Sequence, residues 1–192
     1  MKTFTCLLIL FAVSSAFAQQ LDVPLPPKPA GVGNGPSLAD TMKFIEERLN
    51  STGPVSFINY THNNITGTDG TSKLTYEMTN VRAGAEGCRI DYHIRLTVNE
   101  KVGSDRDVSF SLKDAHEVMM TTEDQSLKEA NSKRGNPETA FRTDPPVFSI
   151  FVKGKNAGLA SFKLYDGSLA NRITTALLHA VELCGGGSKE PF

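Results

Sequence analysis

The sequence predicts an α+β, β-rich domain: about seven antiparallel strands in a bent sheet or partly open barrel, closed by a C-terminal helix and preceded by one extra N-terminal helix. Two observations support this prediction. Apolar and polar residues alternate over several stretches between 55 and 164, as in strands with one buried face. From Ala160 to Cys184 the apolar period changes from 2 to 3.6, which is typical of a strand followed by an amphipathic helix.

Residues 1–18 have the layout of a cleaved secretory signal peptide. Lys2 precedes an apolar run from Leu7 to Val13, and the small-residue site Ala16-Phe17-Ala18 stands before Gln19. The run is too short to span a bilayer, and no later stretch is apolar for long enough. We therefore expect a secreted or periplasmic chain with no transmembrane segment.

Residues 19–36 form a segment with five prolines and three glycines. This composition does not bury a core, so we expect a flexible or polyproline tether, then a single globular domain of residues 37–187 and a tail of residues 188–192. The chain has 20 Lys and Arg against 21 Asp and Glu residues, a formal net charge of −1. Such a balance gives no long-range attraction to nucleic acid, and we expect no nucleic-acid partner.

The first helix is predicted to begin after Ser37, a favourable N-cap, and to end in the stretch from Asn50 to Pro54. Its apolar stripe consists of Leu38, Met42, Ile45 and Leu49. Phe44 lies off this stripe, so we expect either a second contact or an exposed aromatic residue.

Strands are predicted next, at 55–60 and around 73–79, separated by a loop at 61–71 that is rich in Asn, Thr and Gly. The clearest strand follows, with its apolar face formed by Cys88, Ile90, Tyr92, Ile94, Leu96 and Val98. After a turn at 99–103, alternation resumes at 108–112 and in a shorter strand around 118–121.

Residues 122–146 break the alternating pattern. Thr122 and Gln125 fit a capping box for a short helix that reaches Lys133. Because Leu127 is the only large apolar residue of that helix, we expect an exposed and mobile excursion. The stretch 147–153 then resumes as a strand with apolar residues on both faces, typical of a central or helix-covered strand.

Two cysteines, Cys88 and Cys184, remain after the predicted leader. A disulfide between them would close a loop of about 97 residues and contribute roughly 4 to 5 kcal/mol. Two buried free thiols are the alternative. A catalytic thiolate is disfavoured, since Cys184 stands at a predicted helix C-terminus, followed by three glycines, where the helix dipole opposes negative charge.

The polar face of the clearest strand contains the candidate site residues Arg89, Asp91, His93 and Arg95. One interpretation is a surface for an anion or polar ligand at Arg89, His93 and Arg95, or a general base at His93 oriented by Asp91. The other is a solvated face with cross-strand ion pairs, which is preferred because no Ser or Cys pairs with His93 by spacing.

No metal or cofactor is expected, because the histidines do not stand at ligand spacing; they are His62, His93, His116 and His179.

The order of elements over 55–184 resembles the pleckstrin-homology-like superfold, notably the segments 110–118 and 161–184. The chain from residue 37 onward is also similar to uncharacterised exported proteins of soil bacteria, notably at 37–42 and 179–187. These resemblances imply a bent sheet plugged by its last helix. They imply no activity, because one superfold hosts many functions.

The expected function is therefore that of an exported, non-enzymatic binding or interaction domain. Its partner is expected to be a protein, a surface polymer or an apolar small ligand, bound at one edge or mouth of the sheet. Two alternatives stay open: a small hydrolase-type enzyme that uses Asp91 and His93, and a structural component of the cell envelope.

Overall fold

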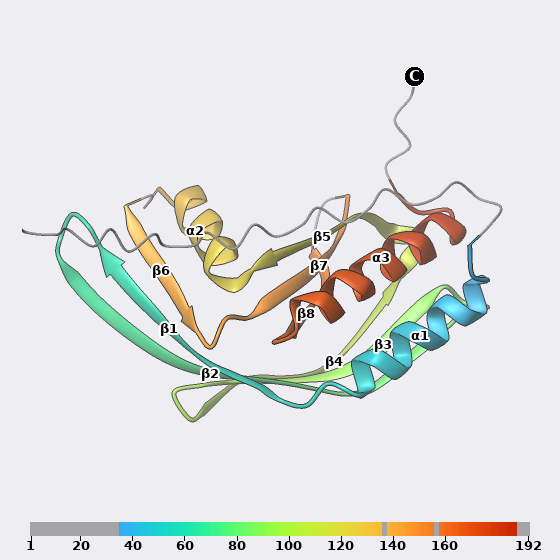
Figure 1. The fold of residues 1–192 in the computed structure, drawn as a ribbon, viewed down its shortest axis with the longest axis horizontal. Coiled ribbons are helices and arrows are strands. Elements are labelled where there is room, and N and C mark those ends of the chain that lie inside the picture. The colour runs from blue at the N-terminus through green and yellow to red at the C-terminus, as the bar shows by residue number, and fades with distance from the viewer. Residues whose placement is uncertain (1–34, 136–137, 156–157, 188–192) are drawn as a thin grey trace, which may run out of the picture.

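The computed structural model describes residues 35–135, 138–155 and 158–187 (Figure 1). The elements are α1 (Leu38–Asn50), β1 (Val55–Asn63), β2 (Thr68–Gly84), β3 (Arg89–Val98), β4 (Lys101–Ser111), a 3₁₀ turn (Leu112–Asp114), β5 (Ala115–Thr122), α2 (Glu123–Lys133), β6 (Thr139–Asp144), β7 (Phe148–Gly154), β8 (Gly158–Leu164) and α3 (Gly167–Leu183).

These strands form two antiparallel sheets, one of five strands in the order β4-β3-β2-β1-β6 and one of three in the order β5-β7-β8. The predicted α+β, β-rich class is confirmed. The structure has eight strands in place of about seven, and they divide between two sheets that do not close into a barrel within the described residues. None of the described helices is long and apolar enough to cross a membrane.

Helix α1 forms as the sequence predicts. The Ser37 side chain accepts the N–H of Asp40, and the predicted stripe residues Met42, Ile45 and Leu49 are buried. The helix lies on β2 and runs beside α3 (Figure 1). The side-chain amide of Asn50 bonds to both the N–H and the carbonyl of Val81, which fixes the end of α1 on the sheet.

The two sheets share one hydrophobic core. The Tyr92 ring of β3 packs 5.3 Å from the Phe162 ring of β8, between ring centroids. The Tyr76 hydroxyl of β2 donates to the Ser161 carbonyl of β8 at 2.7 Å, so β8 lies over the inner face of the larger sheet. Burial raises the pKa of Tyr92 to about 12 and that of Tyr76 further above its ordinary value.

The predicted loop at 61–71 is wrong in its extent. Strand β1 continues to Asn63 and pairs with β2 from Thr68, so only residues 64–67 form the turn. The Asn63 side chain accepts the N–H groups of Ile65 and Thr66 there. Most side chains at the tip of this hairpin are exposed. A strand with both faces exposed to solvent shows no alternation of apolar and polar residues, so the sequence did not mark it as a strand.

The described residues of the predicted excursion at 122–146 contain a helix and a strand, α2 and β6. The capping box at Thr122 and Gln125 begins α2 as predicted, and β6 pairs antiparallel with β1. Strand β6 was not predicted because backbone hydrogen bonds to β1 hold it in place. Such bonds need no apolar side chains, so they leave no pattern in the sequence. The mobility of this stretch stays a prediction.

Helix α3 ends the described fold as predicted. It is capped by the Asp166 side chain and buries one face, formed by Ala170, Ile173, Thr174, Leu177, Ala180 and Val181. At its C-terminus Gly185 takes a positive φ of 78°, its N–H bonds to Glu182 and that of Gly186 bonds to Val181. This is the Schellman arrangement, in which a glycine takes the left-handed position.

The predicted cysteine pair is also present. The sulfurs of Cys88 and Cys184 are 2.10 Å apart, which links the start of β3 to the end of α3. The predicted leader (residues 1–18), nearly all of the tether and the tail lie outside the described residues.

Candidate functional site

The four residues predicted from the clearest strand lie on the outer face of β3, and each bonds to a neighbour on the sheet. Arg89 donates to the Asp91 carboxylate at 2.9 Å. Ser109 of β4 also donates to Asp91. Asp91 and His93 therefore do not form the proposed acid-base pair, because the Asp91 carboxylate is bonded to Arg89 and Ser109.

His93 instead lies between two carboxylates of β4. Its Nδ1 is 2.9 Å from Asp107 Oδ1, and its Nε2 is 2.8 Å from Asp105 Oδ1. Arg95 also contacts Asp105, with 3.2 Å between Nε and Oδ2. This polar face thus contains cross-strand pairs between β3 and β4, formed by His93 and Arg95 with Asp105 and Asp107, and one pair within β3, Arg89 with Asp91.

The pKa shifts of this face follow from the same contacts. Hydrogen bonds from Ser109 and Arg89 lower the pKa of Asp91, and the Asp107 and Asp105 carboxylates raise the pKa of His93. Both ring nitrogens of His93 face these two carboxylates. The described residues contain no group of three or more potential metal ligands.

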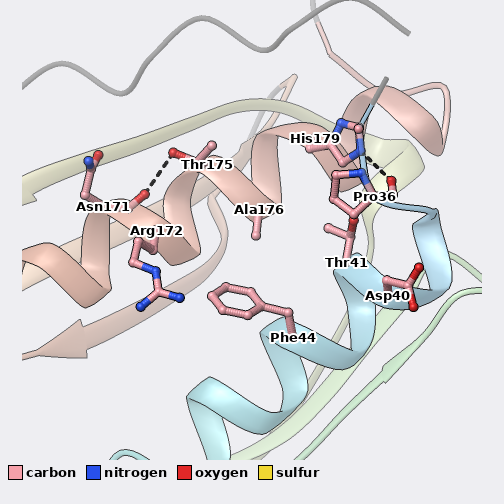
Figure 2. A pocket seen from close by; sticks show the side chains of 10 residues that line it. Pro36, Asp40, Thr41, Phe44, Asn171, Arg172, Thr175, Ala176 and His179 are labelled. Atoms are coloured by element: carbon pink, nitrogen blue, oxygen red, sulfur yellow. Dashed lines mark hydrogen bonds between the residues drawn. The ribbon is translucent and has the colours of Figure 1, made fainter. Parts of the chain in front are cut away.

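A different site lies between the two helices that pack side by side. We call it the α1–α3 groove, a cavity of about 610 Å³ lined by Gly35, Pro36, Asp40, Thr41, Phe44, Asn171, Arg172, Thr175, Ala176 and His179. Figure 2 shows Phe44 of α1 opposite Arg172 and Ala176 of α3, while Asn171 and Thr175 point to the other side of α3.

The groove follows from helix geometry. Asp40 and Phe44 are four residues apart on α1, and Arg172, Ala176 and His179 follow at spacings of four and three on α3. Residues at these spacings share one side of a helix. Each set lies beside the buried stripe of its own helix, so packing α1 against α3 leaves both at the rim of the contact.

Phe44 is the aromatic centre of the groove. Its ring is partly buried, and the guanidinium carbons of Arg48 and Arg172 lie 5.6 and 5.4 Å from its centroid. Within the described residues neither arginine has an ion-pair partner. Phe44 is thus the second contact that the sequence allowed for α1, and its ring lies next to the guanidinium groups of Arg48 and Arg172.

The first described residues of the chain close one end of the groove. The His179 ring donates from Nε2 to the Pro36 carbonyl at 2.9 Å (Figure 2). A Cβ added at Gly35 would stand 3.1 Å from His179 Cε1, a close approach. On α3, the Asn171 Oδ1 atom is buried and has no hydrogen-bond donor among the described residues.

The sequence contains one signal for this site, the position of Phe44 off the apolar stripe. Periodicity does not show which helix α1 contacts, so Arg172 and His179 were not predicted as site residues. The expected position was an edge or mouth of the sheet, whereas the largest of three described cavities lies between helices.

No known family model, curated protein sequence or solved structure matches this chain.

Proposed function

We propose that this chain is an exported, non-enzymatic binding domain whose α1–α3 groove binds an elongated apolar ligand that carries an anionic group. The observation that carries the proposal is the Phe44 ring flanked by Arg48 and Arg172, two guanidinium groups without ion-pair partners in the described residues.

The apolar part of the ligand is held by the middle of the groove. Phe44, Ala176 and Pro36 present carbon surface, and the cavity of about 610 Å³ lies within the range of small-ligand sites. Each Å² of apolar ligand surface removed from water here contributes roughly 25 cal/mol. A ligand of flat or extended shape fits best, because the groove is bounded by two long helices.

The anionic part is selected at one end of the groove. Arg172 lines the cavity and bonds readily to a carboxylate, sulfonate or phosphate through its planar fork. Asp40 lies toward the other end and repels the same group. This asymmetry orients the ligand along the helices.

Export is part of the proposal. The leader-like layout of residues 1–18 supports it, and so does the Cys88–Cys184 pair, since disulfides persist in oxidising compartments. Relationship to uncharacterised exported bacterial proteins stays a prediction. The structural alternative, an envelope component, lacks a specific observation in its favour, and the hydrolase alternative loses the Asp91–His93 pair.

The test uses two fluorescent probes that differ in charge, anilinonaphthalene sulfonate and the neutral phenylnaphthylamine. We expect Arg172→Gln to weaken binding of the sulfonate by about tenfold or more and to leave the neutral probe unchanged. Phe44→Ala should weaken both probes, since it removes the apolar surface that they share.

The matched controls are Arg134→Gln, an exposed arginine after α2, and Ile65→Ala, which removes an apolar side chain that is 78% exposed. Neither should change the binding of either probe. Thermal melts identify any variant that is simply unfolded. Equal sulfonate affinity for Arg172→Gln and the unsubstituted chain, both folded, would refute the proposal.

A further inference from the structure

We infer that the α1–α3 groove binds a ligand with opposite charges at its two ends, an anionic group at one end and a protonated amine at the other, joined by an apolar chain of about 10 Å. The inference rests on the proposed function, because it keeps the apolar centre and the anion site of the same groove. It adds a second polar site, at Asp40, and so names the ligand class: zwitterions whose charges are far apart.

The two helices place opposite charges at opposite ends of the groove. They run antiparallel, so Asp40 of α1 lies at the end that contains His179, whereas Arg172 of α3 lies at the other end, beyond Phe44 (Figure 2). Arg48 follows Phe44 by one turn of α1, on the side away from Asp40. A ligand with only an anionic group therefore uses one end of the groove and leaves the charge at the other end without a partner.

The Asp40 carboxylate is available to a cation. The Ser37 hydroxyl donates to its Oδ2 atom at 2.6 Å, and a carboxylate has about four acceptor positions, so most of its capacity remains. The nearest lysine on α1, Lys43, pairs with Glu47 instead. In the described part of the chain no lysine or arginine forms an ion pair with Asp40.

The Pro36 carbonyl adds an acceptor at the same end of the groove. It accepts one hydrogen bond, from His179 Nε2 at 2.9 Å, and its second lone pair is open to another donor. A protonated amine has three donors, enough for both Asp40 and Pro36. A methyl group in the same place satisfies neither acceptor.

Helix geometry sets the length of the ligand. Asp40 and Arg48 are about 12 Å apart along α1, at about 1.5 Å per residue. Along α3, Arg172 and His179 are about 10 Å apart by the same rule. Eight staggered bonds of an alkyl chain span about 10 Å, and so do three extended peptide residues. The class therefore includes aliphatic acids with a terminal amine and short apolar peptides, and the test separates these two sources.

Calorimetric titration of the full-length chain with matched ligands tests the inference. 8-Aminooctanoate and octanoate differ only in the terminal amine, and trileucine and N-acetyl-trileucine differ in the same charge. We expect the charged amine to tighten binding about two- to fivefold, the range for an exposed ion pair. 4-Aminobutanoate is too short to reach from Arg172 to Asp40 and should gain nothing over butanoate.

Variants of Asp40 show where the amine binds. Asp40→Asn should bring the affinity ratio of 8-aminooctanoate to octanoate to about one, since the amide still accepts the Ser37 hydroxyl but has no charge. Asp40→Lys should reverse the preference, so that octanedioate binds more tightly than 8-aminooctanoate. The control Asp69→Asn, at a side chain that is 81% exposed on β2, should leave the ratio unchanged. Thermal melts identify any unfolded variant.

The outcomes separate this inference from the proposed function. Equal affinities within both ligand pairs, or an advantage of the amine that survives Asp40→Asn, overturn the inference, whereas Arg172-dependent sulfonate binding in the same chain leaves the proposed function standing. An advantage that needs Asp40, in a chain whose sulfonate binding does not depend on Arg172, supports the amine site and refutes the proposed function. An Asp40-dependent advantage in one ligand pair alone supports the inference and identifies the source of the ligand.

Discussion

Helices α2 and α3 lie at opposite ends of the described fold and are docked by different physics (Figure 1). Six residues of α3 are buried, and its end is joined to β3 by the Cys88–Cys184 pair. Only one residue of α2 is buried, Glu123, and its carboxylate bonds to Ser149 and Lys163. One helix is thus held by many apolar contacts and the other by one desolvated charge network.

The two kinds of docking therefore respond differently to mutation. Apolar contacts add up, so losing one of six weakens α3 by a fraction. A buried ion pair loses nearly all of its stabilising effect when one member is removed, because the other charge then stays buried without compensation.

Removing the covalent link at the α3 end should have the largest effect. We expect Cys88→Ala with Cys184→Ala to lower the free energy of unfolding by about 4 to 5 kcal/mol, because the link spans 96 residues of the unfolded chain. Urea denaturation of the double variant beside the reduced and oxidised unsubstituted chain measures this. If all three chains unfold at the same urea concentration, the bond does not form or does not stabilise the fold.

Breaking the charge network at the α2 end should come next. The side chains of Lys163 and Glu123 are 13% and 8% exposed, so Lys163→Met leaves a buried carboxylate and should cost about 3 kcal/mol or more. The matched control is Lys153→Met, whose partner Glu117 is 54% exposed and whose loss should cost less than about 1 kcal/mol.

The double variant Glu123→Leu with Lys163→Met separates the cost of burying the two charges from the attraction between them. Replacing both charges removes the desolvation cost together with the attraction, so it should be more stable than Lys163→Met alone. Denaturation midpoints of the two variants decide the point. A double variant less stable than the single variant would mean that Glu123 docks α2 without needing Lys163.

Gly186→Ala should have a moderate effect at the α3 end. A Cβ there would stand 2.4 Å from the Leu112 carbonyl oxygen and 2.9 Å from that of Ala115, so backbone must move. We expect a loss of about 1 to 3 kcal/mol, the range for overpacking. Gly53→Ala is the control, because no atom lies within 4 Å of its added Cβ, and its thermal midpoint should be nearly unchanged.

Much of the structure around α3 could be predicted because the sequence signals for it lie close together along the chain. The stripe through Ile173 and Leu177, the Asp166 cap and the glycines after Cys184 are all visible within 25 residues of sequence. The same holds for α1 and for the alternating face of β3. The pairing of Cys88 with Cys184 followed from there being no other cysteine after the leader.

The α2 end was not predictable in the same way because its partners are distant in sequence. Strand β6 pairs Asp144 with Ile58, and Lys163 approaches Glu123 from a third strand. A charged residue at a helix start normally indicates a solvated N-terminus, and nothing local marks Glu123 as buried. The α1–α3 groove escaped prediction for a related reason, since Phe44 and Arg172 meet only through helix packing.

The smallest expected effect concerns the polar face of β3 and β4, which belongs to neither end. Asp107 and Asp105 raise the pKa of His93, so NMR titration should give a midpoint above the ordinary value of about 6.5. The raised pKa means that this stabilisation is fully present below the unfolded pKa and is lost as pH rises through the folded pKa. Asp107→Asn should lower the midpoint more than Asp105→Asn. The opposite order would show that Asp105, shared with Arg95, is the dominant partner of the imidazolium.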